Sequence, residues 1–155
     1  MTISAIIVLV VRLLFPLTIF RWRIGGSVGS MLLDGVDVIL VDALASVLGE
    51  EPGLGDHYQS FDKWLDMYYL TIEAFVAVRF SNLLVRNTSI GLYCFRLLGI
   101  VVFALTGEKY RKLIFFFPNL FENFFLFAIL AERFSPKLLP TNKLQLVLVL
   151  ALLYI

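Results

Sequence analysis

Six carboxylates interrupt two apolar segments of the chain, and they are the residues best suited to chemistry. The segments run from Gly25 to Gly49 and from Phe61 to Phe80. Together they carry Asp34, Asp37, Asp42, Asp62, Asp66 and Glu73. An ionisable side chain inside a membrane helix is costly, so by default it marks a functional site with a partner. These side chains could bind a cation, take up protons or pair with arginines.

Helical spacing would gather these carboxylates into two stripes. At 100° per residue, the three acids of the second segment fall within about 40° of one another. In the first segment Asp34 and Asp37 are i,i+3 neighbours, and Asp42 lies about 80° from Asp34. We therefore expect the second segment to face Asp34 and Asp37 inside a helix bundle.

Arginines near the middle of other apolar segments are the expected charge partners. At 1.5 Å of rise per residue, the carboxylates nearest in depth to Arg12 are Asp34 and Asp37. For Arg96 they are Glu73 and Glu122. A buried guanidinium cannot lose its charge, so each arginine must find carboxylates on other helices.

Two interpretations of this polar centre remain open. In the first, the charges pair across helices and lock them together, as polar groups often do in membranes. Alternatively, the acids outnumber the two arginines and form a water-reachable cavity that binds or passes a cation or protons. Binding or passage of a cation or protons is therefore the leading predicted function. An accessory or scaffold subunit of a larger membrane complex is the alternative, and an enzyme is not favoured.

The composition predicts an all-α, polytopic transmembrane protein. Of the 155 residues 60% are hydrophobic and 16% are charged, whereas soluble domains are about 45–50% apolar and about 25% charged. The mean hydropathy is +0.90. The net charge of +1 offers no basic surplus for nucleic acid. The expected partners are the lipid bilayer and other membrane subunits.

Five or six spans are expected in a single membrane domain, 1–155. They cover 3–20, 25–48, 62–80, 88–106, 113–131 and 144–155. The last is incomplete, because a helix needs about 20 residues to cross the bilayer core. Pro16 predicts a kink in the first span. At the start of the second span, the pairs Gly25/Gly29 and Gly26/Ser30 have the spacing that lets helices approach closely.

The distribution of lysine and arginine predicts an orientation. Basic residues are concentrated in the loops after the first, third and fifth spans, which the positive-inside rule places in the cytoplasm. The acidic loop 49–61 is then non-cytoplasmic. We expect a prokaryotic cell membrane, because the stretches DKWLDMYYL and FFFPNLFENFF resemble polytopic proteins of bacteria and archaea whose function is uncharacterised.

A partial resemblance to a family of lipid enzymes rests on the acidic motifs. Asp34-Gly35 and Asp62-Lys63-Trp64-Leu65-Asp66 resemble parts of the divided pattern D-x2-D-G-x2-A-R…G-x3-D-x3-D of the CDP-alcohol phosphatidyltransferases. The resemblance implies six spans and a divalent cation as cofactor. The metal ligands that it implies are Asp34, Asp37, Asp62 and Asp66.

The sequence departs from that family pattern at several positions. With Asp34-Gly35 as the match, Met31 stands at the first aspartate position and Val38-Ile39 at the A-R pair. With Asp34 and Asp37 as D-x2-D, Val38 stands at the glycine and Val41-Asp42 at the A-R pair. By rise per residue Asp34 lies near mid-span and Asp62 near the outer surface. We therefore expect no metal site that Asp34 and Asp62 share.

Overall fold

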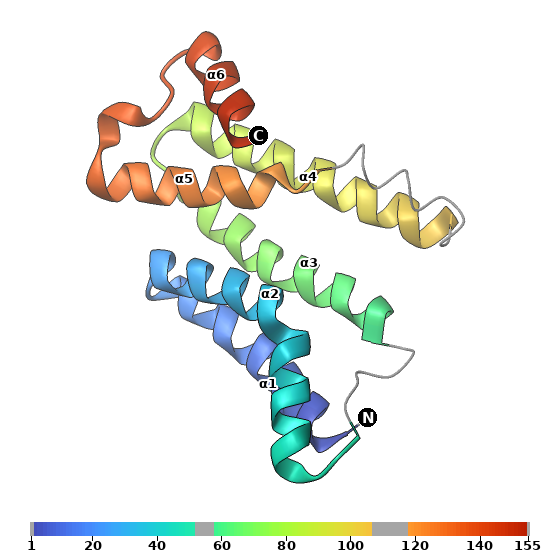
Figure 1. Cartoon of the computed structure of the whole chain (residues 1–155). Helices are drawn as coiled ribbons and strands as arrows, with labels where there is room; N and C mark the ends of the chain where they lie inside the picture. The colour runs from blue at the N-terminus through green and yellow to red at the C-terminus, as the bar shows by residue number, and fades with distance from the viewer. Residues whose placement is uncertain (1, 52–57, 107–117, 155) are drawn as a thin grey trace. The chain divides into compact units, whose positions relative to one another are not determined.

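The computed structural model describes residues 2–51, 58–106 and 118–154, and gives no side-chain account of 58–63, 103, 104 and 106. Within these ranges the regular structure is entirely helical, which confirms the all-α prediction (Figure 1). The elements are α1 (Ile3–Leu14), η1 (Phe15–Phe20), α2 (Arg23–Leu48), α3 (Tyr58–Ala77), α4 (Leu83–Thr106), α5 (Leu120–Phe134), η3 (Pro136–Leu138) and α6 (Lys143–Tyr154).

Two stretches in the described part of the chain are long and apolar enough to cross a membrane, Ile3–Phe20 and Leu83–Val102. The other predicted spans stay predictions. The chain forms two compact units, 1–72 and 73–155, and α3 contributes to both. The single membrane domain also stays a prediction.

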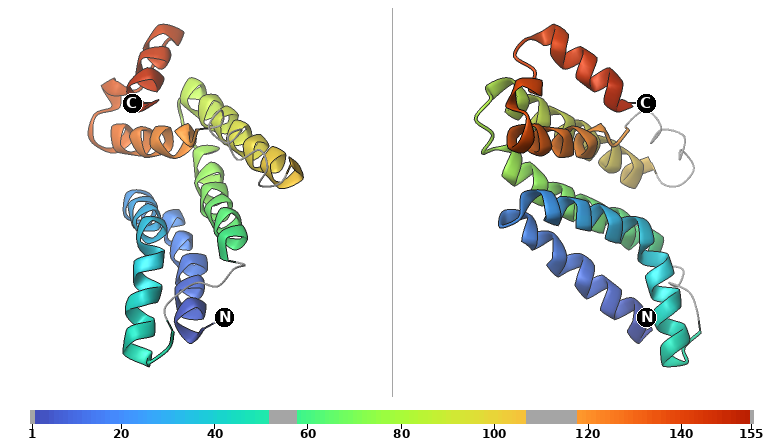
Figure 2. Two further views of the ribbon diagram at one scale, coloured as in Figure 1. Left: turned by 45° about the vertical axis from the view of Figure 1, so that its right-hand side comes forward. Right: turned by 60° about the vertical axis from the view of Figure 1, so that its left-hand side comes forward.

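In the first unit, α1 and η1 pack along α2 (Figure 2). Ala5, Val8 and Val41 form a buried apolar cluster, with Leu40 and Leu44 packed against it. Pro16 lacks an N–H and cannot donate to the carbonyl of Arg12, so the α-helix ends at Leu14 and continues as the 3-10 helix η1. The predicted kink is thus a change of helix type.

Glycines set how closely α2 approaches η1. A Cβ added at Gly26 would lie 2.6 Å from the backbone N of Ile19, and one at Gly29 would collide with the Phe15 ring. One added at Gly25 would meet nothing within 4 Å. The close approach predicted from small residues therefore uses Gly26 and Gly29, and the neighbour is the segment directly preceding α2.

The two ends of this helical hairpin are joined by a carboxylate. Gly49 ends α2 in the left-handed conformation, with φ of 69°, which suits glycine. Glu50 then accepts hydrogen bonds from the backbone N–H groups of Ile3 (2.9 Å) and Ser4 (3.1 Å) at the start of α1. The Ser4 and Ile3 bonds lower the pKa of the Glu50 carboxyl from its ordinary 4.5.

In the second unit the core is aromatic. Phe121, Phe124 and Phe125 of α5 are fully buried, and Phe125 contacts Phe80, with ring centroids 5.8 Å apart. Asn82 accepts hydrogen bonds from the N–H groups of Leu84 (2.9 Å) and Val85 (3.2 Å) at the start of α4. Its amide also donates to the carbonyl of Pro140 at 3.1 Å.

Helix boundaries differ most from the prediction at the fifth span. The prediction placed Pro118 and Asn119 inside a helix over 113–131, but α5 begins at Leu120 with Asn119 as its N-cap. Proline disfavours helical geometry in the residue before it and donates no N–H, so it precedes the helix here. Residues 113–117 lie outside the described residues. The sixth helix, α6, has only 12 residues and buries none of them.

Candidate functional site

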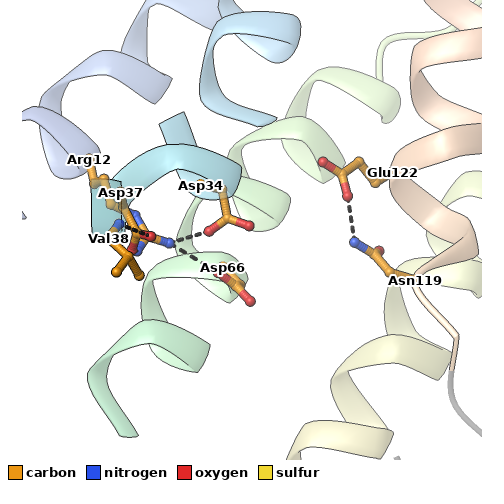
Figure 3. A network of polar contacts seen from close by, with 7 residues as sticks. All are labelled: Arg12, Asp34, Asp37, Val38, Asp66, Asn119 and Glu122. Atoms are coloured by element: carbon orange, nitrogen blue, oxygen red, sulfur yellow. Dashed lines mark hydrogen bonds and ion pairs between the residues drawn. The ribbon is translucent and has the colours of Figure 1, made fainter. Parts of the chain in front are cut away.

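Arg12, in the last turn of α1, is the centre of a buried group of charges (Figure 3). Its guanidinium donates hydrogen bonds to three carboxylates, from Asp34 and Asp37 on α2 and from Asp66 on α3. The Asp66 bond measures 3.1 Å. We call Arg12 and these three aspartates the Arg12 cluster. The contacts confirm the expected pairing of Arg12 with Asp34 and Asp37, while the functional role of these residues stays a prediction.

The members of the cluster differ in burial. The side chains of Arg12 and Asp37 are 4% and 7% exposed, whereas those of Asp34 and Asp66 are 31% and 24% exposed. The cluster therefore has a closed side at Asp37 and an open side at Asp34 and Asp66. Three carboxylates around one guanidinium leave an excess of formal negative charge, most of it on the open side.

Backbone contacts position the cluster. The hydroxyl of Tyr68, two residues after Asp66, donates to the carbonyl of Leu13 at 2.9 Å, next to Arg12. On α2, the N–H of Val38 donates to Oδ1 of Asp37 at 2.6 Å. The Asp37 carboxylate thus competes with the backbone carbonyls of α2 for the N–H of Val38. This contact lies near the middle of α2, where the helix bends (Figure 2). The Tyr68 hydrogen bond ties α3 to the end of α1, and the Val38 hydrogen bond holds the second oxygen of Asp37.

The other predicted site residues take no part in the hydrogen bonds that the structure gives the Arg12 cluster. Asp42 is exposed on α2. Asp62 belongs to α3, but its side chain lies outside the described residues. Glu73 is buried and belongs to the second unit.

Arg96 and Glu122 also belong to the second unit. Glu122 accepts a hydrogen bond from the Asn119 amide at 2.6 Å (Figure 3). The expected pairing of Arg96 with Glu73 or Glu122 stays a prediction.

The described residues do not fit a metal cofactor. Among them no group of three or more histidine, cysteine, aspartate or glutamate side chains is arranged to hold an ion. Asp34, Asp37 and Asp66 do converge, but on the Arg12 guanidinium. A fixed positive charge at that position repels a divalent cation. The transferase interpretation, which needs such an ion, gains no support from this geometry.

Two contacts were not expected from the sequence. The sequence predicts that Asp66 lies on the stripe facing Asp34 and Asp37, but it does not predict the contact of Asp66 with Arg12. The sequence predicts only that Glu50 belongs to the acidic loop 49–61, whereas its carboxylate binds the first turn of α1. The available signal for Glu50 was its position one residue after a glycine that ends a helix, where the chain reverses.

Comparison with known protein families, with curated proteins and with solved structures finds no match for this chain.

Proposed function

We propose that this chain is a polytopic integral membrane protein whose Arg12 cluster binds or passes protons or a small cation. The observation that carries the proposal is one buried guanidinium surrounded by three carboxylates, two of them partly exposed. The guanidinium cannot give up its proton. Any change in the charge of the cluster is therefore made by a proton or cation that arrives at a carboxylate.

The excess of acids favours binding over a purely structural lock. A buried pair stabilises best when its charges cancel, because every uncompensated buried charge carries a desolvation cost. One carboxylate would neutralise Arg12, yet three contact it. The two additional acids are the more exposed ones, Asp34 and Asp66, where water can deliver a positive charge.

The membrane setting is part of the same proposal. The apolar stretches Ile3–Phe20 and Leu83–Val102 support it, and the remaining predicted spans complete a bundle of five or six helices. Lipid surrounds the bundle, and the loop 49–61 faces the non-cytoplasmic side of a prokaryotic cell membrane. In this setting Arg12 and its partners are intramembrane charges, which are by default functional.

The experiment compares the wild type with two single variants, Asp34→Asn and Asp66→Asn. The purified protein in liposomes is assayed for proton uptake after a pH step and for binding of radioactive sodium. We expect either variant to lose uptake, and the exposed Asp42→Asn control to keep it. Wild-type uptake in both Asp34→Asn and Asp66→Asn would exclude the cluster as the site.

A scaffold or accessory role is the second candidate, and one observation favours it. The contacts of Arg12 tie α1 to both α2 and α3 in the first unit. Under this role Asp34→Asn and Asp66→Asn lower the free energy of unfolding, and the wild type takes up neither protons nor sodium. Uptake of protons and sodium by the wild type, together with the free energy of unfolding of the two variants, therefore separates the two functions.

A further inference from the structure

Two buried serines of α2 take no part in the hydrogen bonds of the Arg12 cluster. Ser27 and Ser30 are 3% and 4% exposed, and in the described part of the chain neither hydroxyl oxygen has a hydrogen-bond partner. A helical serine or threonine can donate to a carbonyl one turn earlier. Ser89 does so, to Val85 at 2.9 Å. Ser27 and Ser30 thus lack both this bond and solvent.

These serines share a helix face with the open side of the Arg12 cluster. Ser30 precedes Asp34 by four residues and Ser27 precedes it by seven, so both fall within about 40° of Asp34 around the helix. Their side chains form a polar stripe that begins one turn after Arg23, at the start of α2, and ends at Asp34. Asp34 is the most exposed carboxylate that Arg12 contacts.

Buried polar groups in proteins are almost always hydrogen-bonded, to protein or to ordered water. Buried water typically binds such otherwise unsatisfied groups, two to four at a time. The hydroxyls of Ser27 and Ser30 and the partly exposed carboxylate of Asp34 lie on one helix face and offer the hydrogen-bond partners that such waters need. A dry interior would instead leave both hydroxyls without compensation.

We infer that ordered water bound to Ser27 and Ser30 forms a proton path from the Arg23 end of α2 to Asp34. This rests on the proposed function and narrows its ligand to the proton. Arg12 already places a fixed positive charge among the carboxylates, which disfavours a metal cation, whereas a proton needs no coordination shell. Each hydroxyl can both donate and accept, as a relay requires.

The transfer itself is simple. A hydronium ion on the path gives its proton to a carboxylate oxygen of Asp34 and becomes water, and release runs in reverse. The charged groups that face Asp34 are Arg12 from α1, Asp37 from α2 and Asp66 from α3. Protonation removes one negative charge from a group that has an excess of them.

Silver-ion labelling tests the water directly. Cysteines are introduced one at a time by Ser27→Cys and Ser30→Cys in a Cys94→Ala background, since Cys94 is exposed. Silver ions reach a thiol only through water, so we expect both variants to be labelled. Ser89→Cys is the matched control, because Ser89 is also a buried helical serine. If Ser27→Cys and Ser30→Cys are as unreactive as Ser89→Cys, no water path exists.

Alanine variants give a second measurement that does not depend on labelling. If water binds the hydroxyls, Ser27→Ala and Ser30→Ala lose those bonds and lower the Tm. If the hydroxyls are dry and unpartnered, the same variants raise the Tm by removing an uncompensated polar group. An increase in Tm for both would overturn the inference.

Proton kinetics separate failure of the path from failure of the proposed function. In liposomes we expect Ser30→Ala to slow proton uptake after a pH step while the final extent stays that of the wild type. A wild-type rate in Ser30→Ala would refute the path and leave the cluster as the binding site. A wild-type protein that takes up no protons would refute the proposed function and, with it, the proton path.

Discussion

Replacing Arg12 by methionine is the sharpest perturbation of the cluster. Methionine keeps a long, unbranched side chain on α1 but removes the guanidinium that Asp34, Asp37 and Asp66 contact. The effect on stability depends on what each carboxylate can do without its partner. Asp34 and Asp66 are partly exposed and can be solvated, whereas the Asp37 side chain is only 7% exposed.

The magnitude follows from that difference in burial. Removing one partner of a buried ion pair costs about 3–5 kcal/mol, because an uncompensated charge remains inside the protein. An ion pair that stays in contact with solvent contributes only about 0–1 kcal/mol. We therefore expect Arg12→Met to lower the free energy of unfolding by about 3–5 kcal/mol, almost all of it from Asp37.

Chemical unfolding of the purified protein in detergent, followed by circular dichroism, measures the change. Arg21→Met is the matched control, because Arg21 is an exposed arginine at the end of η1, and such a change stays within about 0.5 kcal/mol. Arg12→Lys keeps the charge but loses the planar fork of donors, and we expect an intermediate loss. A change below about 1 kcal/mol in Arg12→Met would mean that Asp37 does not depend on this arginine, and the reasoning would be refuted.

Three further predictions concern how the helices are held. Gly26→Ala drives a Cβ against the backbone of Ile19 and should lower the Tm, whereas Gly25→Ala meets nothing within 4 Å and should raise it by favouring helix; equal shifts would refute the close approach. Glu50 has a lowered pKa in the folded state, so its contribution to the stability of the fold is complete above pH 4.5. This contribution is lost as the pH falls through the pKa that Glu50 has in the folded state. The Tm gap between wild type and Glu50→Gln should therefore close in acid, and a gap that persists at pH 2 would contradict this. Asn82→Ala should cost about 0.5–2 kcal/mol as a lost helix cap, and Asn82→Asp, which keeps the capping oxygen, should cost less in the same unfolding measurement.

The helices were predictable because apolar runs and their breaks are local features of the sequence. The predicted spans 25–48 and 144–155 agree with α2 and α6 to within two residues. The pairing of Arg12 with Asp34 and Asp37 was also predictable, since rise per residue fixes relative depth along neighbouring helices. The start of the fifth helix was misplaced because the apolar run continues through Pro118, which the backbone does not tolerate in mid-helix.

Long-range contacts were harder to predict. Glu50 meets Ile3 only because the hairpin of α1 and α2 returns the chain to its start, a closure across 47 positions. Asp66 of α3 meets Arg12 of α1 at the point where α2 also supplies Asp34 and Asp37 (Figure 3). No local pattern encodes such a convergence, since it depends on crossing angles that side-chain packing sets.

We expect the unpaired charge of Asp37 to account for the instability of Arg12→Met, and not the loss of Arg12 contacts in general. Double variants test this. Asp37→Asn removes the charge and keeps an oxygen that can accept from the Val38 N–H, as Oδ1 does now. A buried neutral group without its partner costs about 1–3 kcal/mol, against about 3–5 for a stranded charge. Adding Asp37→Asn to Arg12→Met should therefore recover about 2 kcal/mol. Adding Asp34→Asn instead should recover little, because Asp34 is already partly solvated. Equal recovery by the two double variants, measured by the same chemical unfolding, would show that the excess charge is shared across the cluster rather than borne by its buried side.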